Sequence, residues 1–416
     1  MTGGGPRPPV EASGFEVLGY TDVGHRPPFK LALQVVGNQW YLYTAHLWHR
    51  GWSIVDVTDP ARPAPVAFVP GPANTWTHQV QVADGLMVTA LARIPPRWGG
   101  RAEEGFAEAA IVWDVRDPVA PRELARLSFG GTGSHRNFWA GGRYAWLATN
   151  AAGYANYLLV VIDLADPSRP REVGRWWVEG QGPGETPSPG EDGLSLHGPA
   201  YVVGSLAYLA WGGAGMIVLD VADPTRPRLV SRLDVSPPFN GGLYGAGIHT
   251  AMPFPRRGLA LVNGEAHEER CAEPLTFAGI LDIGDPADPR LLSMLPLPRP
   301  TSGLPYTSYC DKGGRFGPHN SHLPQGQIDL EDRDDVAYMT WFNAGLRAYD
   351  LTDPRLPVEI AHFVPADPVR RYGPLPETAL VTQSEDVLVD RRGVVYLSDK
   401  NQGLYLLRLT ATPGAS

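Results

Sequence analysis

Short apolar runs rich in β-branched residues recur along the chain, and each ends at an aspartate. Examples are WSIVDV, AAIVWDV and GMIVLDV, at residues 52–57, 109–115 and 215–221. Their composition and length predict buried strands. A proline-containing turn and a second strand pattern follow each run, as in RPAPVAFV at residues 62–69. The hydrophobic pattern therefore predicts an all-β fold.

The same five-residue corner, Asp, apolar, any residue, Asp, Pro, closes six of these runs. It starts at Asp56, Asp114, Asp163, Asp220, Asp282 and Asp350. Aspartate can bond the local backbone and proline presets φ, so this pair suits a strand-to-strand corner. Two more strand patterns precede each run, for example HQVQVADGLMVTAL at residues 78–91. Four strands in about 50–70 residues predict one propeller blade per repeat.

A seventh copy, GLYLLRLTATP at residues 403–413, lacks the corner and leaves its blade one strand short. The isolated strand pattern FEVLGYTDV, at residues 15–23, can supply the missing strand. The sequence therefore predicts a seven-bladed β-propeller closed by an N-terminal strand, which leaves no free sheet edge. Residues 15–413 are expected to form this single domain, and residues 1–14 a flexible tail.

The repeats resemble a known family of bacterial β-propellers. GWSIVDVTDPARPAPVA, GMIVLDVADPTRPRLVS and GLRAYDLTDPRLPVEIA, starting at residues 51, 215 and 345, resemble the LVIVD repeat. The resemblance covers essentially the whole chain and implies a propeller. It does not imply an activity, because propellers support many functions and function depends on the site.

The composition agrees with a folded all-β protein that binds a small molecule. The 48 glycines and 42 prolines recur at intervals, as turns between many strands would. A net charge of −9 without a basic run argues against nucleic acid and anionic membranes as partners. No apolar run approaches the length of a membrane span. The oligomeric state stays open.

Cysteine usage and the N-terminus favour a cytoplasmic location. Cys271 and Cys310 have no metal-type spacing, and we expect them to be bystanders rather than a disulfide. The N-terminal segment MTGGGPRPPVEASG has neither the basic nor the apolar region of a signal peptide.

Aligning the innermost strand of each predicted blade on its following turn reveals a repeated histidine. Lys30 and Glu385 take this position in the first and last blades. The other five blades carry His78, His135, His197, His249 and His319. One residue per blade at the mouth of the central channel points to a common centre. The pattern predicts a metal site, because several imidazoles can share one ion. The alternative is that these histidines bond water and neighbouring carbonyls in a wet channel.

Imidazole ligands suit one transition metal ion, with iron favoured and zinc, manganese or copper possible. Which of the five histidines are ligands stays open. Lys30 is expected to neutralise Glu385, or else Glu385 is itself a ligand or orients a ligand histidine. The site is similar to the four-histidine iron of carotenoid-cleaving oxygenases and to the three-histidine site of propeller oligogalacturonate lyases. Selenium-binding-type propellers are a third similar group. The fifth histidine and the neighbouring Glu385 depart from all of them.

Long loops should form a walled aromatic pocket over the ion. From these loops Tyr244, Glu265 and His267, together with Glu385, are candidate catalytic groups that move protons. The sequence thus predicts a metal-dependent enzyme acting on a small organic substrate, aromatic or apolar in character. An oxygenase or oxidase is favoured over a redox-neutral lyase or hydrolase. A non-catalytic binding scaffold is the remaining alternative.

Overall fold

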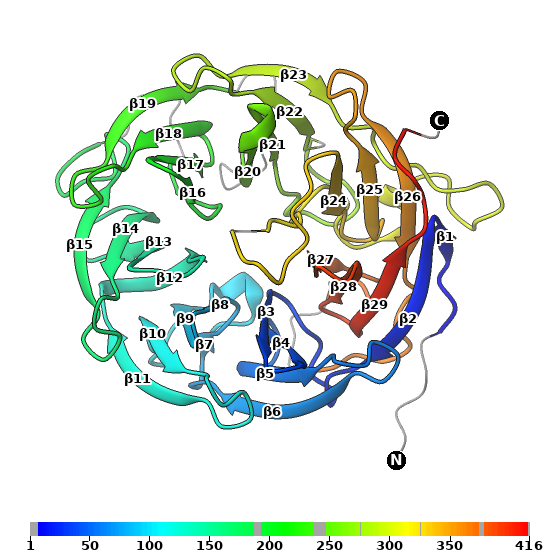
Figure 1. The fold of residues 1–416 in the computed structure, drawn as a ribbon, viewed down its shortest axis with the longest axis horizontal. Helices are drawn as coiled ribbons and strands as arrows, with labels where there is room; N and C mark the ends of the chain where they lie inside the picture. Colours follow the sequence, from blue (N-terminus) through cyan, green and yellow to red (C-terminus); the bar gives the residue numbers. More distant parts are fainter. Residues whose placement is uncertain are drawn as a thin grey trace.

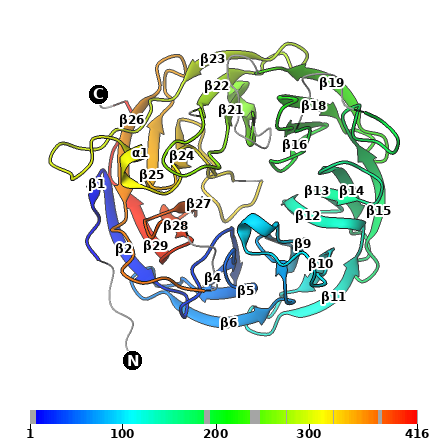
Figure 2. The same ribbon diagram turned by 180° about the vertical axis from the view of Figure 1, so that it is seen from behind.

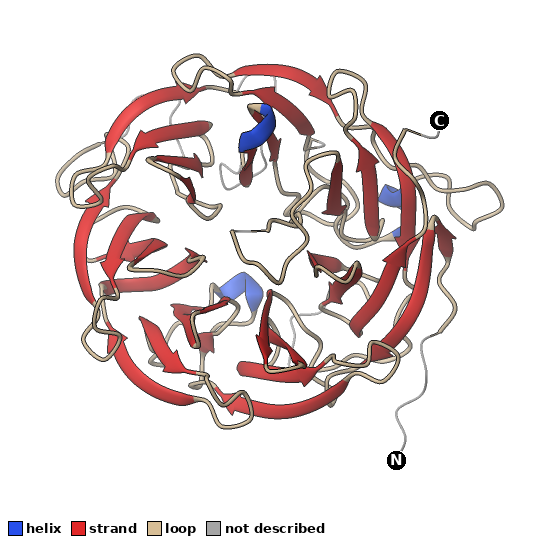
Figure 3. Cartoon of the chain, viewed as in Figure 1, coloured by secondary structure: helices blue, strands red, loops and turns tan. Residues whose placement is uncertain are grey.

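The computed structural model describes residues 7–186, 193–235, 247–274, 276–324, 326–373 and 378–414. In these ranges antiparallel sheets stand around a common axis (Figure 1). Strands and loops make up nearly all of this part of the chain (Figure 3). Its helices are three short segments: η1 (Pro96–Trp98), η2 (Pro255–Arg257) and α1 (Tyr309–Lys312). None of the three has the length and apolar character needed to cross a membrane.

Three four-stranded sheets follow the chain order from the axis outward. The first consists of β3 (Leu31–Val36), β4 (Gln39–Ala45), β5 (Gly51–Asp56) and β6 (Ala64–Pro70). The second consists of β16 (Tyr201–Val203), β17 (Leu206–Ala210), β18 (Met216–Asp220) and β19 (Arg228–Leu233). The third consists of β20 (Thr250–Phe254), β21 (Leu259–Asn263), β22 (Ala278–Asp282) and β23 (Arg290–Met294).

A nine-stranded sheet consists of two such units in contact. Its first half holds β7 (Thr75–Trp76), β8 (Val80–Ala83), β9 (Leu86–Arg93), β10 (Ala109–Asp114) and β11 (Arg122–Leu127). Its second half holds β12 (Gly130–Phe138), β13 (Tyr144–Ala151), β14 (Leu158–Asp163) and β15 (Arg171–Trp176). The halves meet at a single ladder pair, Gly133 with Ala92. They therefore pack as two separate units around the axis (Figure 1).

The last two sheets each take a strand from the N-terminus. One pairs β24 (Val336–Thr340), β25 (Leu346–Asp350) and β26 (Val358–Val364) with β1 (Glu11–Ser13). The other pairs β27 (Ser384–Val389), β28 (Val394–Asp399) and β29 (Gly403–Leu409) with β2 (Phe15–Thr21). The sequence predicts a flexible tail up to residue 14, whereas β1 lies within that range and is hydrogen-bonded to β26. The Glu11 carboxylate also accepts hydrogen bonds from the Tyr309 hydroxyl at 2.7 Å and the Thr301 amide at 2.8 Å.

The aspartate-proline corners share one hydrogen-bonding pattern. In each, an aspartate side chain accepts from a backbone amide that has no backbone acceptor at the turn. Asp56 Oδ1 accepts from the Thr58 amide at 2.9 Å, and Asp59 Oδ1 accepts from the Ala61 amide at 3.0 Å. The strand before each corner also carries an irregular step in its ladder with the outermost strand. These steps fall at Ile54/Val55, Val112/Trp113, Val161/Ile162, Val218/Leu219, Ile280/Leu281 and Ala348/Tyr349. A bulge increases the local twist, so every repeat turns its outer strand in the same way.

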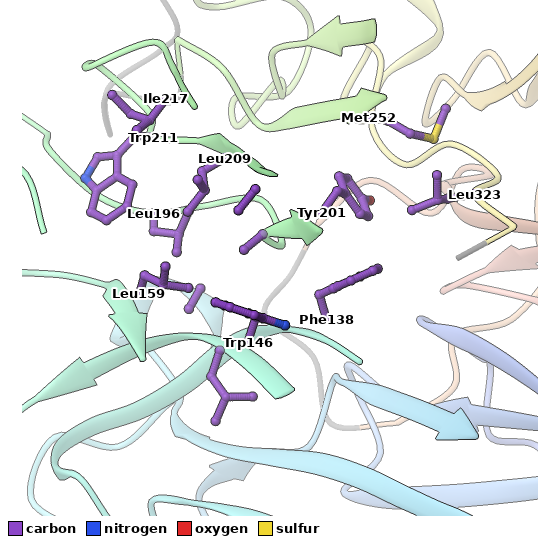
Figure 4. Packing of buried hydrophobic residues seen from close by; sticks show 14 of the residues in the cluster. Phe138, Trp146, Leu159, Leu196, Tyr201, Leu209, Trp211, Ile217, Met252 and Leu323 are labelled. Carbon is purple, nitrogen blue, oxygen red and sulfur yellow. The ribbon is translucent and has the colours of Figure 1, made fainter. Parts of the chain in front are cut away.

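The core lies between the faces of neighbouring sheets. Every residue of β14 is buried, whereas the outermost strand β11 has no buried residue. Trp146 and Leu159 of one sheet face Leu196, Leu209 and Trp211 of the next region of the chain (Figure 4). The strands formed by the β-branched runs are buried on both faces of their sheets. For this reason their sequences are continuously apolar instead of alternating.

The innermost strands surround the axis, and the loop before β24 crosses it on the face seen in Figure 1. Gln327 in this loop donates a hydrogen bond from Nε2 to the carbonyl of Val82, in β8, at 2.9 Å. Within this loop, a hydrogen bond of 2.8 Å connects Nε2 of His322 to the carbonyl oxygen of Glu331. The other face, seen in Figure 2, carries α1 and the long loops around the predicted site.

Candidate metal centre

The five predicted ring histidines lie side by side around the axis. Successive ring centroids are 4.9 Å apart for His78 and His135, 5.0 Å for His135 and His197, 4.9 Å for His197 and His249, and 4.8 Å for His249 and His319. Each comes from a different unit of the ring, with His78 and His135 in the two halves of the nine-stranded sheet. His135 lies in β12, His197 and His249 closely precede β16 and β20, and His319 lies in the long loop before β24. The alignment on the following turn thus locates the histidines correctly in space. Their ligation of a metal stays a prediction.

Two of the innermost strands contain a bulge at the ring position itself. In β12 the ladder with β13 shifts between Ser134 and Arg136, so His135 is the extra residue. In β27 the ladder with β28 shifts between Ser384 and Asp386, so Glu385 is the extra residue. A bulge breaks the alternation of side chains and re-aims one of them. Arg136 can therefore reach the ring although it follows His135 directly.

Arg136 crosses the axis and contacts histidines of two other sheets. Its Nη2 lies 2.6 Å from Nε2 of His249 and 3.3 Å from Nε2 of His319. Its Nη1 donates to Oδ1 of Asn320 at 3.2 Å. A guanidinium can only donate, so both Nε2 atoms are unprotonated acceptors. Their lone pairs therefore face the axis.

The second ring nitrogens of these two histidines are held by fixed partners. His249 Nδ1 lies 2.8 Å from Oγ1 of Thr250, and His319 Nδ1 lies 2.7 Å from the carbonyl oxygen of Glu385. Because Nε2 is the acceptor in each neutral ring, Nδ1 carries the proton and donates it. Such a hydrogen bond fixes the tautomer and orientation of a metal-binding imidazole.

The Glu265 carboxylate lies among the imidazoles. Its Oε2 is 3.4 Å from Nε2 of His197, 3.5 Å from Nε2 of His249 and 3.5 Å from Nε2 of His267. In a tetrahedral site with bonds of about 2.0–2.1 Å, neighbouring ligand atoms lie about 3.3 Å apart. The donor atoms of His197, His249 and Glu265 all lie within 4.8 Å of one another. These three residues therefore fit one shared ion.

Burial keeps four of the ring histidines neutral, which is the form that binds metals. Desolvation lowers the pKa of His78 and of His197 to about 3. The same cause holds the pKa of His135 and of His249 well below its usual value. At neutral pH these four rings are therefore neutral and do not repel one another as imidazolium ions.

Glu385 forms ion pairs with two cations instead of with Lys30. Its Oε1 lies 3.1 Å from Nη2 of Arg315 and also contacts Nζ of Lys400. Burial acts to raise the pKa of Glu385, but Lys400 and Arg315 outweigh it and lower that pKa. Lys30 pairs with Asp386 instead, at 2.9 Å. The expected ion pair between Lys30 and Glu385 is therefore wrong, and the partner of Lys30 is the next residue, Asp386. The bulge at Glu385 shifts the strand register so that Asp386 faces Lys30.

Of the other three predicted catalytic residues, Glu265 and His267 lie at the ring. Glu265 pairs through Oε1 with Nη1 of Arg315 at 2.9 Å, so one guanidinium joins both carboxylates of the site. His267 stacks on His197 with ring centroids 5.9 Å apart. Tyr244 lies outside the described residues.

Three basic residues of the site were not predicted from the sequence: Arg136, Arg315 and Lys400. Only Arg136 carries a signal, because it directly follows a ring histidine in SHRNF. The other two come from loops between strands, and nothing in the repeat pattern marks them. Their role is visible only once the loops are placed over the ring.

Aromatic side chains that the sequence did not point to lie beside three of the ring histidines. Tyr157 stacks on His135 with centroids 4.9 Å apart, and Phe342 stacks on His319 at 4.7 Å. Trp76 lies 4.9 Å from His78. His249 and His319 are fully buried, whereas the His197 side chain is 18% exposed. A ligand can therefore approach the ring beside His197.

The two cysteines form a disulfide, contrary to the expectation that they are bystanders. Cys271 and Cys310 have Cα atoms 5.4 Å apart and are covalently joined. They join the loop that carries Glu265 to the loop that carries Arg315. The spacing in the sequence gave no sign of this pairing, because the two loops belong to different sheets.

Comparison with known families identifies the repeat. The LVIVD repeat model matches residues 132–177 and 201–235. Two segments of this chain are LVIVD repeats. The first match contains β12 to β15 and the second β16 to β19, so each LVIVD repeat is one four-stranded sheet. LVIVD repeats are typical of β-propellers, and the ring of sheets in Figure 1 has that architecture.

No curated protein matches the chain significantly. Among solved structures, the chain is similar to the crystal structure of the computationally designed Ika8 protein. The two share 10% sequence identity and a TM-score of 0.49, over 92% of this chain and 96% of Ika8. At this level of similarity the comparison supports no conclusion about the function of this chain.

Proposed function

We propose that this LVIVD protein binds one transition metal ion through His197, His249 and Glu265 and is a metal-dependent enzyme. The observation that carries the proposal is the convergence of the two Nε2 atoms on Oε2 of Glu265, at 3.4 and 3.5 Å. These separations are too long for good hydrogen bonds and suit ligands of one ion. His319, with Nε2 3.7 Å from Oε1 of Glu265, is available as a further ligand.

Two histidines and one carboxylate form the ligand set typical of non-haem Fe(II) oxygenases. This set favours iron and an oxygenase or oxidase reaction on a small organic substrate. A ferrous ion held by these residues would supply redox chemistry towards dioxygen, with the organic substrate providing the remaining electrons. The same ligand set occurs in zinc hydrolases, so a redox-neutral lyase or hydrolase is the second candidate.

The surrounding residues have positioning roles in this proposal. Thr250 and the Glu385 backbone orient His249 and His319. Arg315 holds the Glu265 carboxylate so that Oε2 faces the histidines. The stacked Tyr157 provides an apolar wall beside the exposed side of the ring. His267 lies close enough to Glu265 to exchange a proton with a substrate bound there.

Elemental analysis of protein purified without chelator tests the proposal. We expect close to one transition metal ion per chain, and loss of that ion in His249→Ala and Glu265→Gln. His25→Ala is the matched control, because His25 is 60% exposed and pairs with Asp22 at the surface. Oxygen consumption with bound iron would favour the oxygenase, and zinc without oxygen uptake the hydrolase. A wild-type protein that takes up neither iron, zinc, manganese nor copper would refute the metal site and leave a binding scaffold.

We also propose that the propeller has seven blades and is closed by β2. Among the described residues, the five four-stranded sheets and the two halves of the nine-stranded sheet support seven blades. The antiparallel ladder from Phe15 with Leu409 to Thr21 with Leu404 supports closure, because it joins the N-terminal strand to the last repeat. Closure of this kind removes exposed sheet edges.

The disulfide leads us to propose an oxidising compartment in place of the cytoplasm expected from the sequence. Disulfides persist in secreted and periplasmic proteins and are rare in reducing compartments. The Cys271–Cys310 bond supports this location because both cysteines of the chain are engaged in it. Thiol titration of protein from oxidising and reducing compartments would test it.

A further inference from the structure

The buried cations around the ring include one that forms no ion pair with a described carboxylate. Three cationic side chains, Arg136, Arg315 and Lys400, are each at most 5% exposed. Arg315 and Lys400 pair with the buried carboxylates of Glu265 and Glu385, and a third buried carboxylate, Asp399, directly precedes Lys400. A divalent ion bound by Glu265 would add two more positive charges. Uncompensated charge in a buried site is strongly unfavourable, so the loaded site favours an anionic ligand.

Arg136 is the cation without a carboxylate partner. Arg315 and Lys400 both form ion pairs with Glu385. In contrast, no carboxylate of the described residues lies within ion-pairing distance of the Arg136 guanidinium, which contacts only His249, His319 and Asn320. Its Nε is buried and has no hydrogen-bond partner among the described residues.

Metal binding would leave one edge of this guanidinium unsatisfied. Nη2 of Arg136 now donates to Nε2 of His249, the same lone pair that the metal would take. Nε, which has no partner among the described residues, and the Nη2 hydrogen released by His249 would then be two adjacent donors beside the ion, while His319 remains a second acceptor for Nη2. Nη1 stays bound to Asn320, which keeps the fork in place. Two parallel N–H donors match the two oxygens of a carboxylate.

We propose that Arg136 binds the carboxylate of the substrate through Nε and Nη2, next to the His197–His249–Glu265 centre. The substrate class is therefore an organic carboxylate with an apolar or aromatic body. The body would lie against Tyr157, on the side where His197 is exposed. This inference rests on the proposed metal site, because metal binding is what frees the guanidinium edge.

Calorimetric titration of the metal-loaded protein with phenylacetate and with phenylacetamide tests the inference. The two probes have the same shape and differ in charge. Hydrogen bonds to a charged group are strong enough that we expect phenylacetate to bind about 10- to 100-fold more tightly. Arg136→Lys keeps the charge but loses the fork, and should remove most of this preference. Arg169→Lys, at a side chain that is 87% exposed, is the matched control and should keep it.

Each outcome separates the two proposals. Equal binding of acid and amide by protein that holds its metal would overturn the carboxylate site and leave the metal site intact. Binding of inorganic phosphate without binding of phenylacetate would assign Arg136 to a free anion and overturn the organic-carboxylate site. If elemental analysis finds no metal uptake, the metal site and this inference both fail. Circular dichroism of Arg136→Lys identifies a folding defect, and phenylacetate binding in wild type alone then decides.

Discussion

Nη2 of Arg136 lies 2.6 Å from Nε2 of His249, although 113 residues separate them in the chain. The contact places a cation from β12 at the ligand atom of a histidine that precedes β20. The ring therefore contains a guanidinium as well as imidazoles. A metal and a guanidinium compete for one lone pair, so the occupant of the axis determines what Arg136 can bind.

Arg315 should control metal affinity without being a ligand. It donates to Glu265 at 2.9 Å and to Glu385 at 3.1 Å, and so orients the carboxylate that faces the histidines. Loss of such a partner typically weakens metal binding by about 10- to 100-fold. We expect this loss in Arg315→Gln, measured by competition with a chromophoric chelator. Unchanged affinity in a folded variant would show that Glu265 needs no support from Arg315.

Stability should fall in mild acid because of buried neutral histidines outside the ring. Burial lowers the pKa of His46 to about 3, below its usual 6.5, while Pro27 and Ser53 hold its ring. Between these two pH values the unfolded chain binds a proton that the folded chain does not, so stability decreases as the pH falls. For one such histidine the loss from pH 7 to pH 5 is about 2 kcal/mol.

Urea unfolding of metal-free protein at pH 7 and pH 5 measures this loss. In His46→Gln the difference between the two pH values should shrink by about 2 kcal/mol. His25→Ala should leave it unchanged, because His25 is 60% exposed. An identical pH dependence in wild type and His46→Gln would mean that His46 is protonated in the folded protein.

The disulfide should stabilise the site loops. It closes a loop with a sequence separation of 39 residues, and bonds of this kind typically contribute about 2–4 kcal/mol. We expect Cys271→Ser with Cys310→Ser to lower the melting temperature and to weaken metal binding, since the bond joins the Glu265 and Arg315 loops. Differential scanning calorimetry and the chelator competition measure both effects. A variant with wild-type metal affinity would limit the bond to a role in stability.

N-terminal deletions should separate the roles of β1 and β2. Removal of residues 1–9 leaves every ladder intact and should not change solubility or melting temperature. Removal of residues 1–13 deletes β1 and the two hydrogen bonds that Glu11 accepts, and should lower the melting temperature. Removal of residues 1–25 also exposes the edge of β29, and we expect aggregation. A soluble, metal-binding protein that starts at Arg26 would refute closure by β2.

The repeat architecture and the positions of the ring histidines follow from the sequence alone. The corners at Asp56 and its equivalents and the fixed distance from His135 to the next turn are local features, set by short-range hydrogen bonds and strand length. A repeated local structure places equivalent residues at equivalent radii. For this reason one alignment was enough to bring five distant histidines to the same axis.

The tertiary structure alone decided which charged groups complete the centre. The bulge at Glu385 shifts the register by one residue and gives Lys30 to Asp386, and the bulge at His135 turns Arg136 to the axis. Arg315 and the Cys271–Cys310 bond depend on two loops from different sheets packing together. Sequence periodicity cannot report such contacts, because they arise where the repeat is interrupted and where chain segments far apart in sequence meet.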